Sequence, residues 1–165
     1  MAVPRSSSTP GGGALVNLEL FAALLMRWAH ILAAIVALGG SIFFRFVFLP
    51  AAGACLTGDQ SARLRQTFMV RWKRIVHTCI ALFLISGLYN YLVIQRPQHE
   101  GQALYHALFG VKFLLALAVF YLALALTASG AFGSSLRRRA AYWLAMLVAL
   151  AVIVVLISGY MRTAF

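Results

Sequence analysis

Residues 103–128 read ALYHALFGVKFLLALAVFYLALALTA, and this stretch decides the fold class. It holds a single charged side chain, Lys112, within a long run of Leu, Ala, Val and Phe. A helix needs roughly 20 residues to cross the hydrocarbon core of a bilayer, and this stretch meets that length. Its apolar residues do not alternate with polar ones as in a membrane β-strand, so the stretch is predicted to be a transmembrane helix.

Three further stretches have the same character, at residues 18–44, 75–94 and 140–159. The chain is 63% hydrophobic and 10% charged, which is far too little charge for a soluble domain of 165 residues. We therefore predict an all-α membrane protein, a four-transmembrane-helix bundle that forms one domain over residues 14–165. Residues 1–13, with their Ser, Pro and Gly, are predicted to be a disordered tail. Pro50 and Pro97 are expected to end the first two helices.

The formal net charge of +11 is placed asymmetrically. The positive-inside rule makes the segments 45–74 and 129–139 cytoplasmic and puts both termini on the outer side of the membrane. The arginine run at 137–139 is expected to contact anionic lipid headgroups. A nucleic-acid partner is not expected, because no soluble domain presents the charge. Nine of the fourteen basic residues lie on the predicted cytoplasmic side: Arg45, Arg63, Arg65, Arg71, Lys73, Arg74, Arg137, Arg138 and Arg139.

Polar side chains inside the spans gather at one depth. His30, Asn90 and Lys112 each lie about 15 to 17 residues from the cytoplasmic boundary of their helix, or roughly 22–26 Å at the rise of an α-helix. Arg27 and His106 lie slightly further out. Polar groups in hydrocarbon are costly, so three helices that each place one at the same level predict a polar layer in the outer half of the bundle.

The chemistry of this layer favours a tetrapyrrole. A haem site needs an axial imidazole, an apolar slot and cations for the propionates. His30 or His106 offers the imidazole, and Arg27 or Lys112 the cation. A pair of axial ligands, His30 and His106, is disfavoured by their different depths. Copper(I), the alternative metal, prefers thiolate and thioether ligands, and only Met26 stands near His30.

Each of these residues also has a structural interpretation. His30 and Asn90 are suited to hydrogen bonds between helices, and Lys112 lies near enough to the membrane rim to extend outward. His106 is suited to an interfacial position. A small accessory subunit of a larger membrane complex, or a homo-oligomer, would use the same residues only for packing, and this alternative stays open.

Four segments around these residues resemble the CopD/HemJ superfamily of small membrane proteins. They are WAHILAAIVALGG at 28–40, FFRFVFLP at 43–50, RWKRIVHTCIALFLISGLYN at 71–90 and FGVKFLLALAVFYLALAL at 109–126. The resemblance covers residues 28–128. It departs from the family pattern at Ala37 and Leu38, where an aromatic residue is expected before the glycine pair.

The resemblance implies one of two functions. HemJ-type members use a histidine of the first helix and a lysine of the third in tetrapyrrole chemistry and are associated with haem b, which carries over to His30 and Lys112. CopD-type members are linked to copper movement across the inner membrane. The chain is thus expected to be a haem-binding membrane protein, either a protoporphyrinogen oxidase or a non-catalytic protein, with no catalytic residue identified.

Overall fold

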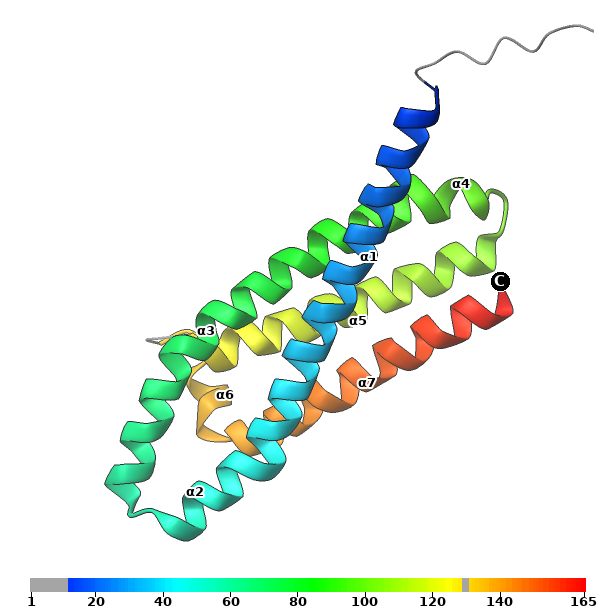
Figure 1. The fold of residues 1–165 in the computed structure, drawn as a ribbon. Helices are drawn as coiled ribbons and strands as arrows, with labels where there is room; N and C mark the ends of the chain where they lie inside the picture. Colours follow the sequence, from blue (N-terminus) through cyan, green and yellow to red (C-terminus); the bar gives the residue numbers. More distant parts are fainter. Residues whose placement is uncertain (1–11, 129–130) are drawn as a thin grey trace, which may run out of the picture.

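The computed structural model describes residues 12–128 and 131–165 of the protein (Figure 1). Every regular element in this part of the chain is helical. In chain order the elements are α1 (Gly12–Phe43), the π-helix η1 (Phe44–Phe48), α2 (Leu49–Cys55), α3 (Gly58–Tyr89), the π-helix η2 (Asn90–Gln95), α4 (Arg96–Gln98), α5 (Ala103–Thr127), α6 (Ser134–Arg138) and α7 (Ala140–Ala164).

The predicted all-α, four-transmembrane-helix bundle is confirmed. Four helical segments are long and apolar enough to cross a membrane: Asn17–Cys55, Gly58–Gln98, Ala103–Thr127 and Ala140–Ala164. A helix satisfies its own backbone hydrogen bonds, as the hydrocarbon core requires. The predicted disordered tail falls outside the described residues, apart from Gly12 and Gly13, which belong to α1.

The prediction that Pro50 ends the first helix is wrong, whereas the second helical segment ends at Gln98, the residue after Pro97, close to its predicted end. The chain continues helically past Pro50 to Cys55 and past Pro97 to Gln98. A π-helical turn ends two residues before each proline, and at the first of them the Leu49 N–H donates to the Phe44 carbonyl oxygen. In an α-helix a proline ring collides with the carbonyl four residues earlier. A π-turn is wider than an α-helical turn and leaves room for the proline ring. The backbone therefore changes to hydrogen bonds between residues five apart, and the helix continues.

The helices form a four-cornered bundle in which chain neighbours are also spatial neighbours. Helix α1 packs on α3, α3 on α5, and α5 on α7, and α7 closes the ring against α1. Helices α1 and α5 therefore stand at opposite corners. Figure 1 shows that the start of α1, helix α4 and the C-terminus lie at one end, hereafter the α4 end, while α2 and α6 lie at the other, the α6 end.

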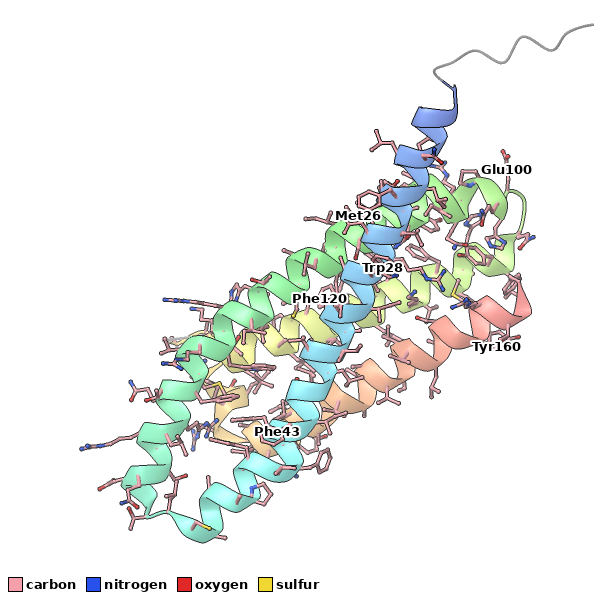
Figure 2. All side chains as sticks on the ribbon, viewed as in Figure 1. Met26, Trp28, Phe43, Glu100, Phe120 and Tyr160 are labelled. Atoms are coloured by element: carbon pink, nitrogen blue, oxygen red, sulfur yellow. The ribbon has the colours of Figure 1, made fainter. Side chains whose placement is uncertain are left out.

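Figure 1 also shows that α1 crosses the bundle obliquely. Near the α6 end it is fixed to α7, because the Arg45 side chain donates its Nε–H to the Ala141 carbonyl oxygen at 2.9 Å. Toward the α4 end α1 runs along α3 and diverges from α7. The two ends of the bundle are thus marked by different residues, with Phe43 toward the α6 end and Glu100 and Tyr160 at the α4 end (Figure 2).

The interior is packed mainly in the half near the α6 end. Leu122 of α5 and Leu147 and Val148 of α7 form the buried apolar cluster. Between η1 and α3, the ring of Phe68 stacks on Phe44 with centroids 4.8 Å apart. Most other large apolar side chains are exposed, as expected where the surface faces lipid rather than water.

One glycine of the Gly39-Gly40 pair sets the approach of α1 to α3. A Cβ at Gly40 would lie 2.1 Å from Cη2 of the Trp72 indole, whereas a Cβ at Gly39 would meet nothing within 4 Å. Only Gly40 therefore permits the close helix contact. Small residues at such contacts let helix backbones approach in a membrane.

Candidate functional site

His30 of α1 is fixed by a two-step hydrogen-bond chain to α3. Its Nδ1 lies 2.8 Å from Oγ of Ser86, and the Ser86 hydroxyl donates to the Leu82 carbonyl oxygen at 2.5 Å. A serine has one hydroxyl hydrogen, and here it is donated in a hydrogen bond to the Leu82 carbonyl oxygen. The Ser86 oxygen must then accept from His30, which places a proton on Nδ1. In the neutral imidazole this leaves the lone pair on Nε2.

The Nε2 atom of His30 makes no hydrogen bond within the described part of the chain. The ring lies over Gly87 of α3, where a Cβ would stand 3.5 Å from its Cε1. Its other neighbour is Phe83, in an edge arrangement with centroids 5.1 Å apart. The side chain is half-buried. The hydrogen bond of Nδ1 fixes the orientation of the ring, and Nε2 is available to a ligand.

Lys112 of α5 reaches the same region from the opposite corner of the bundle. Its ammonium group is half-buried and interacts electrostatically with His30. Within residues 17–128 and 131–165 it has no hydrogen bond and no ion pair. The whole chain contains only three acidic residues, Glu19, Asp59 and Glu100. A cation inside a span therefore stands without a carboxylate partner, which is an expensive arrangement in hydrocarbon.

His30 and Lys112 interact electrostatically, whereas two other predicted members of the layer, Arg27 and Asn90, have no such interaction with His30 among the described residues. Arg27 is exposed on α1, one turn before His30. Asn90 is half-buried at the first position of η2, and its side chain makes no hydrogen bond to another described residue. Among the described residues, neither side chain makes a hydrogen bond to the His30 imidazole.

His106, the second predicted ligand, belongs to a separate cluster at the α4 end. Its Nε2 lies 3.1 Å from the His99 carbonyl oxygen, which only accepts, so Nε2 carries the proton. Its Nδ1 then accepts from the Tyr91 hydroxyl, also at 3.1 Å. Both ring nitrogens of His106 are thus bonded to protein. The buried Tyr105 hydroxyl adds a bond to Gln95 at 3.1 Å. This cluster holds the turn between α4 and α5 onto the bundle.

Histidine 77, on α3, contrasts with both. It is exposed and its Nδ1 donates to the Lys73 carbonyl oxygen of its own helix at 2.6 Å. Among the described residues it makes no hydrogen bond or ring contact with another helix. His77 is therefore a natural control position for substitutions of His30.

No protein-only metal site emerges from the described residues, where no group of three His, Cys, Asp or Glu side chains stands close enough to hold an ion. A ligand set of one imidazole is instead the set that a haem needs from its protein. Neither of the two main cavities is lined by His30. The larger, of about 800 Å³, opens at the α4 end and is lined by Tyr91, Leu92, Arg96, Pro97, Glu100, Gly101 and His106.

Sequence reasoning did not include Ser86, Gly87 or Tyr91 among the site residues. Ser86 stands one helical turn from Asn90 on the same face of α3, and this spacing is the signal that would have found it. Gly87 carries no signal beyond its small size. Tyr91 is recognisable only through its distance to His106.

The comparisons with known proteins do not assign a family. No protein-family model, no curated protein and no solved structure matches the chain. The fold and the site together define the class of protein: a multi-pass α-helical membrane protein with one oriented, open histidine and one unpaired lysine inside its bundle.

Proposed function

We propose that the protein binds haem b in the half of the bundle near the α4 end, with His30 Nε2 as the axial ligand. The observation that carries the proposal is the state of this imidazole, which donates Nδ1–H to Ser86 and leaves Nε2 open. Histidines that ligate metals generally donate their other ring N–H to a fixed acceptor, which sets the tautomer and the ring orientation.

Lys112 supports the same proposal through charge. Its ammonium group lies near His30 without a carboxylate partner among the described residues. A haem propionate is an anion that would neutralise it, with the stronger attraction that a low-dielectric interior gives. Lys112 is therefore proposed to bind a propionate, and Arg27, which is exposed, is not required for it.

Haem binding would require the helices around His30 to separate, because His30 lines neither of the two described cavities. Helices α1 and α5 do not contact each other within the described residues, and α1 diverges from α7 toward the α4 end (Figure 1). Gly87 presents no side chain beneath the imidazole. The resemblance of residues 28–128 to the CopD/HemJ superfamily points to the same His30 and Lys112.

When bound, haem would supply an iron centre able to exchange single electrons. The chain's own contribution is to orient the imidazole through Ser86, to neutralise a propionate through Lys112 and to exclude water with apolar helices. Catalysis, including the oxidation of a porphyrinogen, is not required by this arrangement. A copper site finds less support, because the described residues contain no group of three His, Cys, Asp or Glu side chains that could hold the ion.

The test is the absorption spectrum of the detergent-purified protein expressed with ample haem. We expect a Soret band in the wild-type protein, its loss in His30→Ala, and its retention in His77→Ala, which removes an exposed histidine of another helix. A folded wild-type protein without Soret absorption would contradict the proposal. Co-purification with other membrane chains in that case would favour an accessory-subunit role.

We also propose that the α6 end is cytoplasmic and that the chain resides in a bacterial inner membrane. The support is the placement of nine of fourteen basic residues in segments at that end. In a variant with Cys55 and Cys79 replaced by serine, a cysteine at Ser134 should resist an impermeant thiol reagent in intact cells. A cysteine at Glu100, in the turn at the α4 end, should react. Reversed labelling would overturn the orientation.

A further inference from the structure

A second cavity, of about 590 Å³, lies at the α6 end and is hereafter the arginine cleft. It lies between two parts of the bundle. Leu49 and Arg65 come from α2 and α3, and the other lining residues come from the α6–α7 region. The lining contains four arginines and no carboxylate: Leu49, Arg65, Arg137, Arg138, Arg139, Ala140, Ala141 and Tyr142.

Three of the four arginines of the cleft have no partner of opposite charge among the described residues. Arg65, Arg138 and Arg139 have no hydrogen bond or ion pair within the described residues. Arg137 is held in place by the carbonyl oxygens of Ala125 and Phe132. Like charges that share one cleft repel one another unless an anion or solvent screens them. The cleft lining itself supplies no such anion, because it contains no Asp or Glu.

The start of α7 adds to this field. Ala140 and Ala141, the first residues of a 25-residue helix, line the cleft. The N-terminus of a long helix carries partial positive charge and points backbone N–H groups outward, a combination that binds phosphate. Guanidinium groups bind phosphate oxygens with paired hydrogen bonds. The cleft therefore combines two independent features that each favour a phosphate.

The position of the cleft identifies where the phosphate comes from. It opens where the transmembrane helix α7 begins, at the boundary between apolar helix and arginine-rich turn. Tyr142 is exposed at this level, as tyrosines are at the membrane interface. Basic pockets between transmembrane helices at the membrane surface bind the headgroups of anionic lipids.

We propose that the arginine cleft binds the phosphate of one anionic phospholipid headgroup and thereby ties the α1–α3 hairpin to α7. The bond from Arg45 to the Ala141 carbonyl oxygen already joins these parts beside the cleft. The lipid adds a second connection that also neutralises the guanidinium groups. This site is separate from the His30 region, and its occupancy does not depend on haem or on the orientation in the membrane.

Native mass spectrometry of the full-length, delipidated protein tests the proposal, with phosphatidylglycerol and phosphatidylcholine as probes. We expect one phosphatidylglycerol to bind more tightly than phosphatidylcholine. Arg65→Gln and Arg139→Gln should each weaken its binding by about fivefold, the effect of roughly one basic residue near an anionic lipid. Arg63→Gln is the matched control, because Arg63 is an exposed arginine of the same helix outside the cleft.

Two outcomes would overturn the proposal. Equal losses in Arg63→Gln and Arg65→Gln would show that lipid responds to total charge and not to the cleft. Displacement of the lipid by millimolar inorganic phosphate would show a site for free anions. A rise in the thermal midpoint with phosphatidylglycerol, seen in Arg63→Gln and lost in Arg65→Gln, would add support in a second measurement.

Discussion

Two half-buried histidines of the bundle, His30 and His106, differ in the hydrogen bonds that their ring nitrogens make. His106 uses both nitrogens, one with the Tyr91 hydroxyl and one with the His99 carbonyl, so its bonds are complete within the protein. His30 uses only Nδ1 and keeps Nε2 open. The comparison teaches how to recognise a candidate metal ligand among the histidines of a membrane helix. The useful criterion is a ring nitrogen without a hydrogen bond, and not the depth of the residue in the membrane.

The two sites also depend on different helices. The His30 region is built between α1, α3 and α5, through Ser86 and Lys112. The His106 cluster consists of residues from η2, from the turn that follows α4, and from α5. It contains no residue of α1. A change in α1 packing should therefore disturb the first and spare the second.

The largest expected effect separates the histidines directly. His30→Ala should abolish the Soret band, because it removes the proposed axial ligand. His106→Ala should retain the band and lower the thermal midpoint, because two hydrogen bonds that hold the α4–α5 turn are lost, at about 1 kcal/mol each. Absorption spectra and thermal unfolding in detergent measure both. Loss of a low-spin spectrum in His106→Ala would instead make it a second axial ligand and would break the comparison.

Gly40→Ala should have the next largest effect. The new methyl group would overlap Trp72 and force α1 away from α3, at about 1–3 kcal/mol of stability for an overpacked contact. The matched control is Gly39→Ala, whose methyl meets no atom within 4 Å. Thermal unfolding should separate the two variants, and haem occupancy should fall only in the Gly40 variant. Equal behaviour of the two would mean that α1 packing does not control the His30 region.

Lys112→Met should change stability and binding in opposite directions. Removal of an uncompensated cation from the span should stabilise the haem-free protein by on the order of 1–2 kcal/mol. Loss of the propionate partner should weaken haem binding by about tenfold, as for one charge-assisted hydrogen bond. Haem titration and unfolding of the haem-free protein measure the two effects. A haem affinity that is unchanged would remove Lys112 from the site.

The smallest effects are expected from two variants that each remove one hydroxyl group, one in the His30 region and one in the His106 cluster. Ser86→Ala removes the acceptor of His30 Nδ1, and Tyr91→Phe removes the donor to His106 Nδ1. Each should cost about 1 kcal/mol of stability. Only Ser86→Ala should also shift the Soret band or the haem reduction potential, because the bond to Nδ1 tunes a ligating imidazole. A spectral shift in Tyr91→Phe but not in Ser86→Ala would reverse the assignment of the two histidines.

Part of the candidate site was accessible to sequence reasoning. His30 and Lys112 were predicted to share a level of the membrane, and the structure places them within electrostatic reach. Arg27 was predicted from its spacing to His30, yet it is exposed, since helical spacing gives a direction but not the position of the neighbouring helix. Ser86 was missed as a site residue because its role depends on a contact across 56 positions of sequence.

The sequence by itself determined the number of spans, their helical form and the clustering of charge at one end. These properties follow from local hydrophobicity and from the need to satisfy backbone hydrogen bonds inside hydrocarbon, both of which act within a single segment. Only the tertiary structure decided that the first helix continues through Pro50 and that Gly40 and not Gly39 permits helix contact. It also decided that His30 hydrogen-bonds through one ring nitrogen among the described residues, whereas His106 hydrogen-bonds through both. Hydrogen bonds and contacts form over about 3–4 Å between helices far apart in the chain, so their partners depend on how the helices pack.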